Sequence, residues 1–289
     1  MSTSNPIASS LDLIQARKIA IEAAEAAGQL LQNRSSGDFL VEAKGTKGDV
    51  VTTLDTAAEE LIKSRILDRY PDHQIDAEES GVTGATNSSW TWLVDPLDGT
   101  NNILIGLPVC AVGITLCMND IPVISVLHEP LTKRTWWASR GQGAYGPEGK
   151  KLKCFSRRVA RNQFIFAWSQ GYEVAHDDPI AIASKLVLDR YSRRVLQLWA
   201  PLISWAMLAR GDIDGIVGYR AGPLDLHPGV LLATEAGIQV VDFFGEPFEE
   251  RYKRREERNF LAAAPRAIPR LLELMQRAIS LGDVVHSVL

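Results

Sequence analysis

Apolar and polar positions follow a helical period at the start of the chain. Residues 11–34 place apolar side chains, many of them alanine, three or four apart, which predicts an amphipathic helix. Residues 39–55 predict two short extended segments joined by a Gly/Lys loop. A second helix is predicted over 56–70, with Asp55 or Thr56 as its cap and a proline directly after its end.

The middle of the chain changes to a β-type pattern. A short strand over 73–80 leads into acidic residues, a loop follows at 81–89, and an apolar strand is predicted at 91–94. A glycine-rich turn segment is expected over 141–152. Three β-rich runs separated by turn residues predict an antiparallel meander: 109–118, 122–130 and 134–140.

The second half alternates strands with helices and predicts an α/β unit after an α+β first half. We therefore expect an α/β protein with a boundary near residue 150, giving domains 1–150 and 151–289. The predicted helices are 178–191, 201–210, 226–237 and 267–280. The predicted strands are 163–169, 193–199, 212–219, 238–244 and 259–265.

Composition limits the classes of function. The 289 residues include 31 Lys and Arg against 35 Asp and Glu, a net charge of −4 that predicts no nucleic-acid partner. No apolar run approaches the roughly 18 residues of a membrane span, and the first ten residues lack a signal-peptide pattern. The three cysteines have no metal-ligand spacing and are expected to be reduced. These features predict a cytoplasmic protein without a membrane partner.

The stretch "TWLVDPLDGTNN" (91–102) carries the strongest chemical signal. Asp95 follows an apolar strand, where open sheets place their ligands, and Pro96 is expected to end the pairing of that strand. Asp98 is predicted to cap a helix whose first N–H groups, at Gly99 and Thr100, suit a phosphate. A phosphate beside two carboxylates requires a divalent cation, and an all-oxygen ligand set favours Mg²⁺ over Zn²⁺.

Other strand ends supply more carboxylates. "DAEES" contributes Glu78 and Glu79, and "GPLDLHPG" contributes Asp225. Two cations about 4 Å apart would bind the attacking and leaving oxygens of a phosphoryl transfer. Thr100 would pass a proton from the attacking water toward a carboxylate, and Asp55 is the candidate orienting residue. The spacing of the aspartates excludes haloacid-dehalogenase-type phosphatases, and EF-hand and P-loop motifs are missing from the sequence.

Four motifs then resemble those of the inositol monophosphatase family. They are "KGTKGDVVTTLD", "DAEES", "WLVDPLDGT" and "DLHPGVLLATEAG", and the resemblance covers residues 11 to 280 approximately. It implies a layered αβαβα sandwich, a homodimer and two or three Mg²⁺ ions in each active site. The implied metal ligands are Glu78, Asp95, the Leu97 carbonyl, Asp98 and Asp225. The implied phosphate-binding residues are Asp98, Gly99 and Thr100, and the implied catalytic residues are Thr100, Asp55 and Glu78.

The chain departs from the family pattern around the substrate. Leu224 replaces a tryptophan, and Trp199 and Ala200 fall where inositol phosphatases carry Gly-Ser or Gly-Thr. Gly218 falls where they carry a glutamate that binds inositol hydroxyls. We expect these four residues to set specificity, with the Trp199 indole as a stacking surface. Further candidate site residues are Lys44, Glu79, Asn101 and His227.

The sequence thus predicts a Mg²⁺-dependent phosphomonoesterase of a small sugar, cyclitol or nucleoside monophosphate. Inositol 1-phosphate, histidinol phosphate and 3′-phosphoadenosine 5′-phosphate stay open as alternative substrates. An alternative of another class is a catalytically silent ligand-binding or scaffold protein of the same fold. The charged segment "RYKRREER" (251–258) is expected to be a solvated turn or helix.

Overall fold

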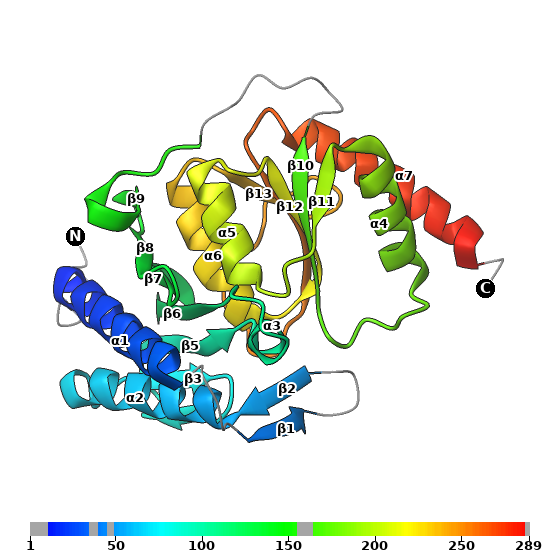
Figure 1. The fold of residues 1–289 in the computed structure, drawn as a ribbon. Helices are drawn as coiled ribbons and strands as arrows, with labels where there is room; N and C mark the ends of the chain where they lie inside the picture. The colour runs from blue at the N-terminus through cyan, green and yellow to red at the C-terminus, as the bar shows by residue number, and fades with distance from the viewer. Residues whose placement is uncertain (1–10, 35–39, 45–48, 155–163, 287–289) are drawn as a thin grey trace, which may run out of the picture.

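The chain folds into five stacked layers of helices and sheets. A computed structural model describes residues 11–34, 40–44, 49–154 and 164–286. From one side to the other, Figure 1 shows a helix pair, a first sheet, a second helix pair, a second sheet and a third helix pair. The predicted αβαβα sandwich is confirmed.

The outer helix pair covers one face of the first sheet. It consists of α1 (Leu13–Arg34) and α2 (Thr53–Arg69), with the hairpin β1 (Val41–Lys44) and β2 (Asp49–Thr52) between them in sequence. Small side chains let α1 approach α2 and the sheet closely. The buried positions of α1 recur every three or four residues, as predicted: Ala16, Ala20, Ala23, Ala24, Ala27 and Leu31.

The first sheet has seven strands in the order β4-β3-β5-β6-β7-β8-β9. All pairs are antiparallel except β3 with β5. The predictions of plain loops at 81–89 and 141–152 are wrong, since β4 and β9 lie there as short edge strands. The bounds are β3 (Gln74–Ala77), β4 (Gly81–Gly84), β5 (Trp90–Asp98), β6 (Ala111–Met118), β7 (Ile121–Glu129), β8 (Arg134–Ser139) and β9 (Gly143–Tyr145).

The middle helix pair fills the space between the two sheets. It consists of α5 (Pro201–Arg210) and α6 (Pro223–Glu235), each with a proline at its first position, where the missing N–H costs nothing. Their apolar side chains belong to one core with residues of both sheets, such as Trp136 of β8 and Phe260 of β14 (Arg258–Ala263). The two halves of the sequence therefore share a core.

The second sheet has five strands in the order β11-β10-β12-β14-β13, with β10 at the centre of two parallel pairs. Helices α4 (Pro179–Tyr191) and α7 (Ile268–His286) pack on its outer face (Figure 1). The remaining strands are β10 (Ile165–Gln170), β11 (Arg194–Leu196), β12 (Gly215–Ala221) and β13 (Gln239–Val241).

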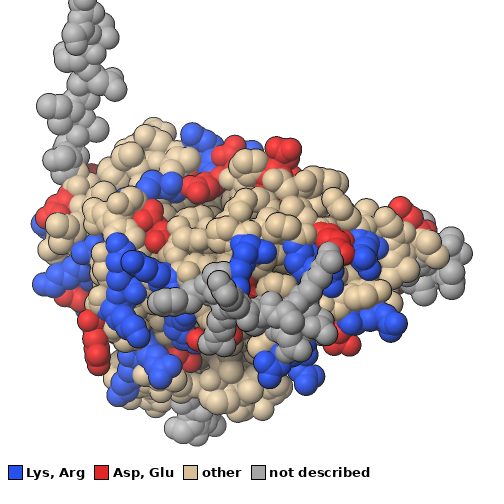
Figure 2. Space-filling model, turned by 90° about the horizontal axis from the view of Figure 1, so that it is seen from above, with Lys and Arg blue, Asp and Glu red and all other residues tan. Residues whose placement is uncertain are grey.

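The surface carries both charges. Lys and Arg side chains lie beside Asp and Glu side chains over much of the face in Figure 2. Among the described residues, every helix is too short or too polar to span a membrane.

Candidate active site

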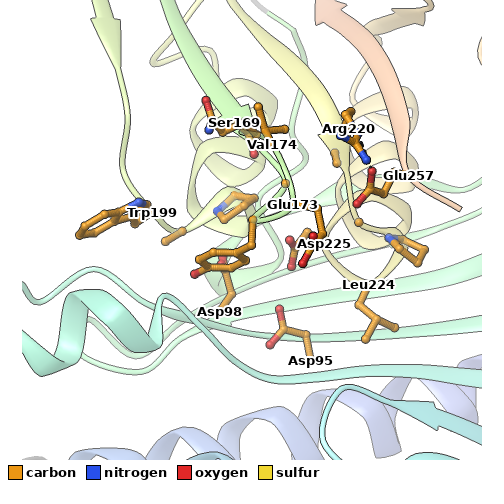
Figure 3. Close-up of a pocket in the computed structure, with 18 of the residues that line it drawn as sticks. Asp95, Asp98, Ser169, Glu173, Val174, Trp199, Arg220, Leu224, Asp225 and Glu257 are labelled. Carbon is orange, nitrogen blue, oxygen red and sulfur yellow. Dashed lines mark hydrogen bonds and ion pairs between the residues drawn. The ribbon is translucent and has the colours of Figure 1, made fainter. Parts of the chain in front are cut away.

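Three carboxylates converge where the two halves of the chain meet. Asp95 and Asp98 come from the end of β5, and Asp225 comes from the first turn of α6. One carboxylate oxygen from each lies within 4.8 Å of the others. Asp95 and Asp98 are buried and Asp225 is half-buried, and Figure 3 shows the three together below the wall of a pocket. The structure thus brings together three of the predicted metal ligands.

A bulge in β5 puts Asp95 and Asp98 on the same side of the sheet. Residues three apart on a regular strand point to opposite faces. Here Asp95 pairs with Gly113 and Asp98 with Ala111, so β5 has one residue more than β6 between these pairs. The prediction that Pro96 ends strand pairing is wrong, because the bulge accommodates a residue without an N–H.

Burial and mutual repulsion act on the two β5 carboxylates. Burial raises the pKa of Asp95 well above its usual value, and the charges of Glu78, Asp225 and Asp98 raise it further. Burial and the charge of Asp225 likewise raise the pKa of Asp98, although the Leu202 N–H donates to its Oδ2 at 2.7 Å. A divalent cation would remove this repulsion, and a set of carboxylate oxygens suits Mg²⁺.

Glu78 reaches the same pocket from the loop after β3. Its backbone N–H donates to the Val94 carbonyl at 3.1 Å. The buried Glu59 of α2 accepts from the N–H groups of Glu79 and Ser80, at 2.7 and 3.0 Å. Glu78 is an exposed residue that lines the pocket, whereas Glu79 does not line it. Glu59 therefore fixes the loop that carries Glu78.

Thr100 and Asp55 form the hydrogen-bonded pair that the sequence predicts. Thr100 Oγ1 lies 2.8 Å from Asp55 Oδ1 and 2.9 Å from the Leu97 carbonyl oxygen. Asp55 is not the helix cap: Thr52 caps α2, and Asp55 completes a capping box by accepting from the Thr52 N–H at 2.8 Å. Burial raises the pKa of Asp55. Helix α2 thus holds Asp55 against α3 (Thr100–Leu104).

Gly99 makes the tight turn from β5 into α3. Its φ is 93°, a left-handed conformation that favours glycine, and a Cβ there would stand 2.7 Å from the Val109 carbonyl oxygen. Thr100 and Asn101 form the first helical turn, where a helix directs its backbone N–H groups outward. The turn therefore supplies the donors expected of a phosphate seat.

The acidic cluster opens into a cavity of about 1130 Å³. Its walls come from the ends of β3 and β5, the segment before α5, the junction of β12 with α6, and two longer segments. One is the end of β10 with the β10–α4 loop, 168–177, and the other lies at 252–257. In Figure 3, Trp199 stands on one side of the carboxylates and Arg220 with Glu257 on the other.

Three of the four predicted specificity residues line this cavity: Trp199, Ala200 and Leu224. Trp199 is 60% exposed and has a φ of 51°, which is uncommon for a bulky residue. Gly218 is not in the cavity wall. A Cβ on Gly218 would lie 1.9 Å from the Phe260 ring, so a larger side chain has no room there.

The further candidates divide between the cavity and the core. Asn101 lines the cavity, and its Nδ2 donates to the Tyr172 hydroxyl at 3.1 Å. His227 is buried outside the lining, with its ring edge-on to Tyr252, and burial lowers its pKa to about 3. The side chain of Lys44 lies outside the described residues.

Comparison with known proteins places this chain in a family. The family model described as "Inositol monophosphatase family" matches residues 12–280.

The chain belongs to the inositol monophosphatase family.

Individual relatives agree with this assignment. "Fructose-1,6-bisphosphatase/inositol-1-monophosphatase" of Aquifex aeolicus is 31% identical over 72% of this chain and 77% of its own length. "Nus factor SuhB" of Escherichia coli K12 is 31% identical over 91% of this chain and 96% of its own length. The crystal structure of extragenic suppressor protein suhB from Bartonella henselae has a TM-score of 0.82 at 24% identity, and the match covers 91% of this chain and 98% of that one.

The sequence did not reveal one buried residue and two segments of the cavity wall in this member of the inositol monophosphatase family. Asn102 is fully buried, and its Nδ2 donates to the carbonyls of Val109 and Leu198, at 2.8 and 2.6 Å. The β10–α4 loop and the segment 252–257 gave no recognisable motif. The prediction of a solvated turn at 251–258 is wrong in part, because Tyr252 lies buried among the charged residues and anchors the segment in the cavity wall.

Proposed function

We propose that this protein is a Mg²⁺-dependent phosphomonoesterase that hydrolyses the monophosphate of a small alcohol. The observation that carries the proposal is the convergence of Asp95, Asp98 and Asp225 within 4.8 Å, next to the Thr100–Asp55 pair. A family of phosphatases with the same fold supports it.

The carboxylates suit cation binding. Asp95, Asp98 and Asp225 are the proposed core ligands, with Glu78 and the Leu97 carbonyl beside them and two or three Mg²⁺ ions in the filled site. Bound Mg²⁺ would neutralise phosphate oxygens and make a nearby water more acidic. The raised pKa values of Asp95 and Asp98 support this assignment, since buried like charges require a counter-charge.

The residues of the chain bind and orient the reacting groups. The first-turn N–H groups after Gly99 would hold the ester phosphate. Thr100 Oγ1, fixed by Asp55, would orient a water molecule in line with the ester bond. Glu78 would contact the same water molecule. Attack of the water oxygen on phosphorus breaks the bond to the alcohol oxygen. The water gives up its proton to a carboxylate, and the alcohol oxygen takes a proton from solvent as it leaves. Asp55 and Glu78 act here as orienting and proton-accepting groups.

The cavity wall supports a substrate with a planar or ring-shaped alcohol. Trp199 and Tyr172 are exposed aromatic side chains of the wall, and aromatic faces stack on bases and sugar rings. We therefore favour a sugar, cyclitol or nucleoside monophosphate. Inositol 1-phosphate, histidinol phosphate and 3′-phosphoadenosine 5′-phosphate belong in the same substrate panel.

A scaffold without catalysis is the alternative, and it has support in the relatives named "Nus factor SuhB". Phosphate release from the panel, with Mg²⁺ and with EDTA, separates the two functions. We expect release only with Mg²⁺. Asp95→Asn should lower kcat by about 100-fold or more, because it removes a proposed ligand, whereas Asp242→Asn, in a surface turn, should keep full activity. Absence of release from every substrate at all Mg²⁺ concentrations would overturn the proposal.

We also propose a cytoplasmic homodimer. The three cysteines are free, as expected in a reducing compartment, and the dimer follows from the family resemblance. Light scattering of the purified chain tests the dimer, and cell fractionation tests the location.

A further inference from the structure

The cavity is larger than one phosphate group requires. At about 1130 Å³ it exceeds the range of about 300–1,000 Å³ that encloses most small ligands. The acidic cluster and the α3 turn form part of its lining. The lining also carries three arginines: Arg220, Arg254 and Arg255.

The segment that carries two of these arginines is anchored to the first sheet. The Tyr252 hydroxyl donates to Asp76 Oδ2, and Arg254 Nε lies 2.9 Å from the same oxygen. Asp76 and Tyr252 are 4% and 7% exposed. The Tyr252 N–H donates to the Asp120 carbonyl at 2.7 Å. This segment is therefore a fixed part of the wall rather than a solvated turn.

Two of the three guanidinium groups are already neutralised. Arg254 pairs with Asp76, and Arg220 Nε pairs with Glu257 Oε2 at 2.8 Å. Arg255 makes no hydrogen bond or ion pair with any residue in the described part of the chain. Its φ of 62° places it in a left-handed turn that few non-glycine residues adopt. The wall thus presents one arginine whose donors are all available.

Arg220 lies next to this segment on β12. Its N–H donates to Asn259 Oδ1 at 2.8 Å, in addition to its contact with Glu257. Figure 3 places Arg220 and Glu257 across the carboxylates from Trp199. An anion beside Arg255 would find a guanidinium group that has no ion pair within the described residues, whereas a neutral alcohol would leave Arg255 without a partner.

We propose that Arg255, with Arg220 beside it, forms a second anion subsite, and that the preferred substrate carries a phosphate or carboxylate on its alcohol in addition to the ester phosphate. This proposal rests on the proposed function, because the subsite acts only when a phosphomonoester lies at the acidic cluster of the cavity. Arginine suits both anions, since its planar donors match phosphate and carboxylate oxygens.

The test compares esters that differ only in the second anion. Alkanediol monophosphates of increasing length form the neutral series. The matched bisphosphates and the matched phosphorylated hydroxy acids form the two anionic series. Each is assayed by phosphate release at saturating Mg²⁺, with the wild type, Arg255→Gln and the control Lys133→Gln. Lys133 matches Arg255 as an exposed cation with positive φ, 55°, and lies outside the cavity wall.

We expect kcat/KM of the wild type to be about tenfold or more higher for at least one anionic series than for the neutral one. Arg255→Gln should remove this preference through KM and leave the neutral series unchanged, and Lys133→Gln should behave as the wild type. The series that responds identifies phosphate or carboxylate. The subsite is refuted if the neutral series is hydrolysed and the anionic series gain nothing, or if Arg255→Gln keeps their advantage. Failure of all three series and of the substrate panel refutes the proposed function instead.

Discussion

Asn102 joins two segments that frame the site. Its side-chain amide is fully buried and donates to the carbonyls of Val109, in the turn behind Gly99, and of Leu198, directly before Trp199. Replacing Asn102 by alanine removes both donors. The two carbonyls then remain in the interior without their partners.

The expected loss of stability follows from these two bonds. A buried polar group that loses its hydrogen bond costs about 1–3 kcal/mol, so two such groups predict a loss of about 2–6 kcal/mol from the free energy of unfolding. At about 2–4 °C of Tm for each kcal/mol in a large domain, this predicts a fall of about 4–24 °C. KM should also rise, because the Leu198 carbonyl is one of the contacts that fix the backbone next to Trp199.

Urea unfolding followed by tryptophan fluorescence measures this change. The denaturation midpoint should fall while the slope m stays constant, which separates lost stability from a less compact native state. Asn101→Ala is the matched control. Asn101 lies one residue earlier on the same short helix, is half-buried, and donates to the Tyr172 hydroxyl of the cavity wall. A loss of less than about 1 kcal/mol is expected there. Equal stabilities for the two variants would show that the buried amide does not hold the frame.

Two further predictions concern the core. Burial lowers the pKa of His128 to about 4 from its ordinary 6.5, so the unfolded chain binds the proton more tightly. Its contribution to stability is complete above pH 6.5 and is lost as the pH falls toward 4. The wild type should lose about 2 kcal/mol more than His128→Gln between pH 7 and pH 5 in urea titrations, and parallel pH profiles would contradict this. Gly218→Ala should destabilise by about 1–3 kcal/mol or more, because the new Cβ meets the Phe260 ring at 1.9 Å. Gly222→Ala, whose Cβ meets nothing within 4 Å, should be nearly neutral in calorimetry, and a similar Tm for both variants would refute the steric argument.

Local patterns explain why much of the site could be predicted. An aspartate at the end of an apolar strand is expected at the edge of a sheet, where ligands bind. The motif around Asp95 and Asp98 combines such a strand end with a proline and a glycine turn. The sequence named Asp55 and Thr100 as partners in the chemistry, but it could not show their hydrogen bond, because the two residues lie 45 positions apart. The structure then explains it physically: the capping box of α2 fixes Asp55, and the Gly99 turn fixes Thr100.

Positions set by distant packing were not predictable in the same way. Counting back from Asp225 placed Gly218 in the substrate site, but the β12–β14 pairing shifts register between Gly218 and Ala221. Gly218 itself pairs directly with Phe260, and the shift follows it on the way to Arg220 in the cavity wall. A bulge of this kind depends on two strands at once, so the sequence of one strand cannot reveal it.

The sequence by itself determined the alternation of helices and strands and the acidic motifs, because each depends on periodicity or on residues close in the chain. The layered sandwich was predicted through the family resemblance. Only the tertiary structure decided how β5 bulges to align Asp95 with Asp98, how Glu59 and Asn102 fix the surrounding loops, and how Tyr252 and Asp76 hold a run of charged residues in the cavity wall. These arrangements join residues up to 176 positions apart. Contacts over such separations form only when the layers pack, and they decide what the cavity can bind.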